Sequence, residues 1–184
     1  MTVWLQDWFW QFHQRLKRQI FQRSRLSYVT WAIAIVCCSV LFSALAAPPA
    51  LAEDFNKGFL VNADFSERVL TDSSFTKANL RGSNFRHTDL QGVSFFGANL
   101  EDANLEGANL KLTTLDTARL VNANLKNAVL EGAFAFNTQF KGAVIEGADF
   151  TDVLLRDDMH DLLCKTAKGV NPTTGRATRE TLEC

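Results

Sequence analysis

The chain repeats every five residues over about half of its length, and this period constrains the fold more than any other feature. Residues 98–100, 103–105 and 108–110 all read Ala-Asn-Leu. From Phe65 to Leu155 every fifth residue, here called a centre, is large and apolar, except at Ala135. The positions two before the centres are mostly Ala, Ser or Thr, with Arg68 as an exception. The positions two after the centres are mostly Gly, Asn or Asp, so each unit has an apolar part and a turn-forming part.

A period of five fits neither an α-helix nor a straight strand. All centres can point inward only if the chain turns a corner in every unit. Gly, Asn and Asp two residues after each centre favour the left-handed backbone that a type II turn requires. Four corners close a square, so one coil takes twenty residues, and stacked coils pair at a strand spacing of about 4.8 Å. We therefore predict an all-β solenoid of nearly five coils over residues 63–155, filled with side chains and without a pore or ligand cavity.

This repeat resembles the pentapeptide-repeat family, whose unit reads A-(D/N)-L-x-x. The resemblance covers about half of the chain and implies a right-handed quadrilateral β-helix. Residues 53–62 are expected to be a lead-in to the first coil. Arg68 departs from the family pattern at an inward position, so we expect the first coil to be irregular.

Residues 1–52 have the composition of an export signal. Five Lys or Arg and one acid lie in this segment, and an uncharged run from Tyr28 to Ala47 follows the basic stretch. Two prolines and the small-x-small site 50–52 come next. This order is typical of a secretory signal cleaved between Ala52 and Glu53. The apolar run also has the length of an uncleaved membrane anchor, and with either interpretation the rest of the chain crosses the membrane.

Residues 156–184 are expected to form a helical cap over the open end of the solenoid, which would otherwise expose unpaired edges. Acidic residues at 157, 158 and 161 favour the start of a helix. Cys164 and Cys184 are the two cysteines outside the leader, and an even pair in an exported protein predicts a disulfide. The bond serves either as a structural staple or, so near a terminus, as a reducible switch.

Residues twenty apart stack in outer columns on the predicted coils. One column alternates in charge: Arg86, Glu106, Lys126 and Glu146. Alternating columns favour solubility and correct register. A different column carries Phe96 and Phe136, and Phe134 lies beside it. Two interpretations are open: a local bulge turns Phe134 or Phe136 inward to replace the missing centre at Ala135, or the rings form an exposed patch that contacts a partner.

The sequence offers little that is typical of catalysis. His87 and His160 are interpreted as solvated surface histidines, because neither has a Cys, Ser or acid at a spacing that suggests a triad. We find no zinc motif and no phosphate-binding loop. We therefore expect no enzyme activity, metal, cofactor or small-molecule substrate.

The cysteine-bracketed tail adds a second resemblance. Residues 163–176, followed by Cys184, are similar to the tail of the thylakoid-lumen pentapeptide proteins of cyanobacteria and chloroplasts. That resemblance implies pairing of Cys164 with Cys184 and a location in the thylakoid lumen, with the periplasm as second choice. It also implies suspected roles around photosynthetic complexes or in redox regulation, without an established activity.

These features together favour a non-enzymatic exported scaffold that binds an unknown protein partner, with membrane contact only through the leader or at the periphery. The formal net charge of −1 excludes a polybasic nucleic-acid binder. One alternative is a nucleic-acid mimic that binds topoisomerases in the cytoplasm, which the leader and the alternating columns oppose. Another is a disulfide-exchange enzyme, which the nineteen residues between Cys164 and Cys184 make unfavourable.

Overall fold

The computed structural model describes residues 52–184. The predicted export signal lies outside the described residues, except for Ala52 at its end. Within the described part, no helix is both long and apolar enough to cross a membrane.

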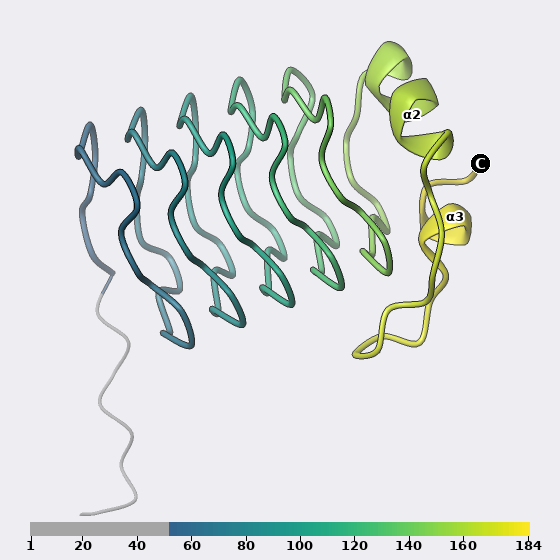
Figure 1. Cartoon of the computed structure of the whole chain (residues 1–184), viewed down its shortest axis with the longest axis horizontal. Helices are drawn as coiled ribbons and strands as arrows, with labels where there is room; N and C mark the ends of the chain where they lie inside the picture. Colours follow the sequence, from purple (N-terminus) through teal and green to yellow (C-terminus); the bar gives the residue numbers. More distant parts are fainter. Residues whose placement is uncertain (1–51) are drawn as a thin grey trace, which may run out of the picture. The chain divides into compact units, whose positions relative to one another are not determined.

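The chain winds into a stack of coils in which residues twenty apart form parallel bridges (Figure 1). One series of bridges joins residues 54, 74, 94, 114, 134 and 154, which corresponds to five coils. Each side of a coil contributes a single bridging residue, so the coils of residues 52–155 contain no strand with bounds of its own. The predicted twenty-residue coil is confirmed.

The coils begin earlier than the sequence predicts. Asp54 already takes part in a bridge, inside the segment 53–62 that we expected to be a lead-in. Phe55 occupies a centre, and its ring stacks on that of Phe75 with the ring centroids 4.6 Å apart. The position two residues before this centre is Glu53, where the repeat elsewhere has a small residue, and this substitution hides the first unit from the pattern.

A residue with left-handed backbone makes most corners, two positions after a centre, and many of these residues are Gly, Asn or Asp. Leu112 and Thr117 also adopt this conformation, with φ of 56° and 59°, although their side chains disfavour it. The backbone N–H of Leu112 donates to the carbonyl of Glu131 in the next coil at 3.0 Å. Pairing between coils therefore overrides local preference at Leu112.

The centres fill the axis of the stack. Those from Phe65 to Phe150 are exposed by 4% or less. Phe65 stacks on Phe85 at a centroid distance of 4.9 Å, and Phe75 stacks on Phe95 at 5.2 Å. These two stacks meet edge to face across the axis, with Phe75 and Phe85 centroids 5.7 Å apart. Such pairs add about 0.5–1.5 kcal/mol beyond burial of their area.

Ala135 remains at its centre and is fully buried, while Phe134 and Phe136 stay on the outside with 42% and 39% exposure. The interpretation that either ring turns inward is therefore wrong, because the bridges of the coil fix which residues point out. Phe140 and Phe150 occupy columns that otherwise contain Leu, and their rings meet edge to face at 6.2 Å.

The corner after Phe136 is nonetheless irregular. Asn137 does not adopt the left-handed backbone. At most corners the backbone N–H two residues after a centre donates to a carbonyl of the next coil. The N–H of Asn137 instead donates to the Asp116 carboxylate at 3.0 Å. The side-chain amide of Asn137 donates to the same oxygen, also at 3.0 Å. A carboxylate thus replaces a backbone carbonyl at this corner.

Arg68 leaves the core, and the first coil stays regular around it. Val69 still bridges to Asp89, so the expected irregularity of the backbone is wrong. The guanidinium of Arg68 lies 3.0 Å from the Glu53 carboxylate and 5.5 Å from the centroid of the Phe65 ring. Near the end of the stack, an inward position is partly open to solvent, which allows a charged side chain to lie there.

The cap lies against the last coil, at the C-terminal end of the stack (Figure 1). It contains α2 (Asp157–Cys164) and α3 (Thr178–Thr181). Between the helices, Val170 and Ala177 form an antiparallel bridge that closes a short loop.

Truncation of a centre tests the inward orientation. Leu105→Ala should lower the free energy of unfolding by about 2–5 kcal/mol, because it leaves a cavity on the packed axis. Val144→Ala is the matched control, since Val144 is 49% exposed on the wall, and should cost less than about 0.5 kcal/mol. Urea unfolding of both variants measures the difference, and equal small losses would show that Leu105 does not point inward.

Candidate functional site

Asn171 attaches the cap to the end of the stack. Its side chain is fully buried, and its amide nitrogen donates to the carbonyl oxygens of Asn127, Ala128 and Gly147 at 3.1, 3.1 and 2.8 Å. Its carbonyl oxygen accepts from the backbone N–H groups of residues 173 and 174. One side chain therefore pairs backbone groups of two coils and folds the cap loop.

The cap also pairs the edge that the last coil leaves open. The N–H of Gly147 donates to the carbonyl of Lys168 at 2.9 Å, and the N–H of Phe150 donates to the Thr181 hydroxyl at 3.0 Å. These contacts satisfy donors that the next coil would otherwise satisfy. The prediction that residues 156–184 cap the solenoid agrees with these contacts.

Arg176 joins the cap to charges on two coils. Its guanidinium lies 3.0 Å from the buried carboxylate of Asp149 and donates to Glu131 at 2.6 Å. Burial raises the pKa of Asp149, but hydrogen bonds from Thr151 and Thr174 and the charge of Arg176 outweigh it and hold that pKa below its usual value. The pKa of Glu131 is also lowered, chiefly by Arg176. The ionised carboxylates therefore stabilise the docked cap.

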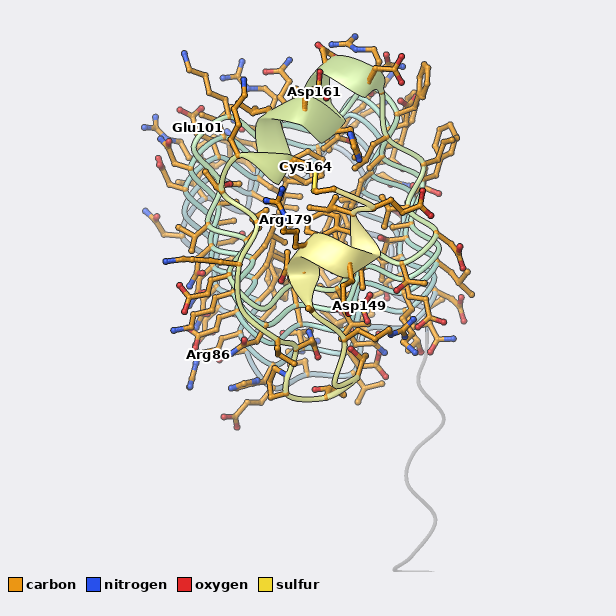
Figure 2. The ribbon with its side chains drawn as sticks, turned by 90° about the vertical axis from the view of Figure 1, so that its right-hand side faces the viewer. Arg86, Glu101, Asp149, Asp161, Cys164 and Arg179 are labelled. Atoms are coloured by element: carbon orange, nitrogen blue, oxygen red, sulfur yellow. A yellow bond between two sulfur atoms is a disulfide. The ribbon has the colours of Figure 1, made fainter. Side chains whose placement is uncertain are left out.

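The predicted disulfide is present between Cys164, at the end of α2, and Cys184. Arg179 lies beside it, and its guanidinium donates to the carbonyl oxygens of Cys164 and Cys184 at 3.3 and 3.4 Å. Figure 2 shows Cys164 and Arg179 close together between α2 and α3. The end of the chain is therefore held by the covalent bond and also by the guanidinium.

His160 lies against this disulfide, so its interpretation as a solvated histidine without a cysteine partner is wrong. Its Nε2 lies 3.7 Å from Sγ of Cys164 and 2.5 Å from the carbonyl oxygen of Leu182. The helix brings residues four apart onto one face, and the i, i+4 spacing of His160 and Cys164 is the signal that could have revealed this contact. His87, in contrast, is exposed on a corner as expected.

A half-open cleft of about 340 Å³ separates the cap from the last coil. Its lining includes His160 and the acidic residues Asp152, Asp157 and Glu183. The cleft therefore places acidic residues beside His160.

The second candidate site is a group of exposed apolar residues on the wall, which we call the aromatic face: Phe96, Phe134, Phe136 and Leu154. Their exposed fractions are 37%, 42%, 39% and 50%. They flank one column of centres, so they project from the same side of the stack. The predicted exposed patch is thus present as a surface, and Leu154 extends it.

The other walls carry basic and acidic side chains that form ion pairs. Arg86 lies 4.0 Å from Glu106, and Arg119 lies 3.3 Å from Glu101. Figure 2 shows Arg86 and Glu101 on the outside of the coils. These walls therefore present mixed charge rather than a strongly acidic face.

Comparison with known proteins agrees with this geometry. The family model for pentapeptide repeats matches eight copies in overlapping segments, at residues 60–95, 73–111, 94–132 and 118–157. The chain belongs to the pentapeptide-repeat family. A solved structure of a pentapeptide repeat protein from the Arabidopsis thaliana thylakoid lumen is 50% identical, with a TM-score of 0.68, over 68% of this chain and 88% of that one.

Two further relatives are similar over shorter stretches. Thylakoid lumenal 15 kDa protein 1, chloroplastic, from Arabidopsis thaliana is 70% identical over 37 residues, which are 20% of this chain and only 16% of that relative. The structure of HetL, from the cyanobacterium Nostoc, is 28% identical with a TM-score of 0.43, over 52% of this chain and 48% of that one. The pentapeptide-repeat protein is thus related to proteins of the thylakoid lumen.

The attachment of the cap through Asn171 is testable. Asn171→Ala leaves three carbonyl oxygens without this donor, and should lower the stability of the cap by about 1–3 kcal/mol. Hydrogen exchange of the Gly147 and Phe150 amides should accelerate, while exchange in the central coils stays unchanged. Asn99→Ala is the matched control, because Asn99 lies on the wall and accepts one bond from Glu101. Equal exchange in both variants would contradict the role of Asn171.

Proposed function

We propose that this protein is an exported, non-enzymatic scaffold of the thylakoid lumen that binds a protein partner through its aromatic face. The observation that carries the proposal is the exposure of three phenylalanine rings and Leu154 on one side of a wall. Elsewhere the large apolar centres are buried. Exposed apolar side chains gathered on one side of a rigid surface are typical of a protein-binding site.

The lumenal location is supported by the relatives, since a lumenal protein is 50% identical over 88% of its chain. The proposed cleavage between Ala52 and Glu53 agrees with the start of the coils. The backbone N–H of Glu53 donates to the Ser73 hydroxyl, and its carbonyl accepts from Ser74. A chain that begins at Glu53 would keep the first coil complete. The periplasm stays the second choice.

The mixed charge of the walls favours a scaffold over a nucleic-acid mimic in the cytoplasm. A mimic needs a continuous acidic face, whereas Arg86, Lys111 and Arg119 form ion pairs with acids of the walls. These pairs interrupt the negative potential that would imitate a phosphate backbone.

We also propose that the scaffold responds to redox conditions through Cys164 and Cys184. Cys184 is exposed, so a reductant has access to it. Arg179 and the buried Leu182 hold the same segment without the covalent bond. Reduction would therefore change the chemistry of this end and leave the tail in place.

Partner capture tests the aromatic face. Phe96→Ser combined with Phe136→Ser should abolish capture of a lumenal protein by the immobilised chain, while the melting temperature stays nearly unchanged. Phe59→Ser is the matched control, because Phe59 is 82% exposed on a different column, and should capture the same protein. Mass spectrometry identifies the protein and calorimetry gives the melting temperature. Retained capture by the double variant would refute this face as the binding site, and a collapsed melting temperature would place the rings in the core.

A further inference from the structure

The disulfide end holds a group of side chains that the scaffold role does not use. A ring nitrogen of His160 and the sulfur atoms of Cys164 and Cys184 all lie within 4.8 Å of one another. We propose that these three residues bind one zinc ion when the disulfide is reduced. Two thiolates and an imidazole are ligands that zinc favours.

His160 is oriented for this role by the chain end itself. Its Nε2 lies 2.5 Å from the carbonyl oxygen of Leu182. A carbonyl oxygen only accepts, so Nε2 carries the proton and Nδ1 of the neutral ring holds a free lone pair. A histidine that donates one N–H to a backbone carbonyl and offers its other nitrogen is the usual arrangement of a metal ligand.

The distance between His160 and Cys164 requires only a small movement. Zinc bonds of about 2.3 Å to sulfur and about 2.0–2.1 Å to nitrogen place the two ligand atoms about 3.5 Å apart at a tetrahedral angle. Nδ1 of His160 lies 4.0 Å from Sγ of Cys164. Both residues lie on one face of α2, so the helix keeps this part of the site in place.

The third ligand stays near because contacts other than the disulfide hold its segment. Leu182 is buried with 3% exposure, and the guanidinium of Arg179 donates to the carbonyl oxygen of Cys184 at 3.4 Å. The same guanidinium donates to the carbonyl oxygen of Cys164 at 3.3 Å. Reduction therefore frees two sulfur atoms without removing these restraints.

The surroundings favour a cation. The Asp161 carboxylate lies 3.8 Å from Nδ1 of His160, and Asp152, Asp157 and Glu183 line the adjacent cleft. Three protein ligands leave the fourth position of zinc to water, as in sites where the metal keeps an open position. The cleft beside His160 is open to solvent.

Zinc binding requires two steps: a dithiol first reduces the disulfide, and the two thiols then bind the metal. A dithiol supplies two electrons and two protons, becomes a disulfide itself, and leaves Cys164 and Cys184 as thiols. Zinc then displaces the two thiol protons to solvent, so its affinity rises with pH. This inference goes beyond the scaffold role and needs only chemical reduction, so its failure leaves partner capture untouched.

Zinc titration of the purified chain tests the proposal. The chain carries Cys37→Ser and Cys38→Ser, so that thiols of the leader do not contribute, and is reduced with a phosphine under anaerobic conditions and then desalted. Competition with a chromophoric chelator should show one zinc per reduced chain and none per oxidised chain. Cobalt in place of zinc should give the charge-transfer absorption of thiolate ligands. A reduced chain without zinc, or an oxidised chain that binds equally, would overturn the proposal.

Two variants separate this site from adventitious binding. His160→Gln should weaken zinc binding by at least about 100-fold, since loss of a direct ligand exceeds the effect of an outer-shell change. His87→Gln, which removes an exposed histidine from a corner of the coils, should leave the affinity unchanged. Equal affinity of the two variants would show that His160 is not a ligand.

Discussion

The structure depends on parallel backbone pairing between residues twenty positions apart. This pairing sets every column of side chains, because a slip by one residue would exchange inner and outer positions. Its strength is visible where it opposes local preference: Leu112 adopts a left-handed backbone that its side chain disfavours, and its N–H pairs with the Glu131 carbonyl of the next coil. It is visible again at Ala135, where two adjacent phenylalanines stay outside although a larger centre would fill the axis better.

A repeat of this kind must end, and here the C-terminal end is covered by specific polar contacts. Asn171 donates to backbone carbonyl oxygens of the last coils, and the Thr181 hydroxyl accepts from an N–H that a further coil would pair. Arg176 adds charge contacts to Asp149 and Glu131, and the disulfide fixes the end of the chain to α2. These contacts hold the cap, which carries His160, Cys164 and Cys184, in a fixed position on the last coil. Stability and the candidate chemistry both arise from the cap, residues 156–184.

Much of this was predictable from the sequence, because the repeat has one dominant period. The centres, the corners, the cap and the pairing of Cys164 with Cys184 follow from periodicity and from the resemblance to the family. The first unit was missed because Glu53 stands where a small residue is usual. Asn171 could not be assigned, because its partners come from distant coils. The contact of His160 with Cys164 was open to prediction from their spacing, whereas its contact with Leu182 depends on the chain end. The bridges between coils place Phe134 and Phe136 on the outside. The composition of the sequence does not reveal which residues form these bridges.

The proposed export and the disulfide of the cap are tested together by the intact mass of the native protein. Protein from fractionated cells is weighed before and after reduction. We expect a chain that begins at Glu53, in the lumenal fraction, two hydrogens lighter before reduction than after it. A full-length, reduced chain in the cytosolic fraction would contradict this expectation and would favour the nucleic-acid mimic instead.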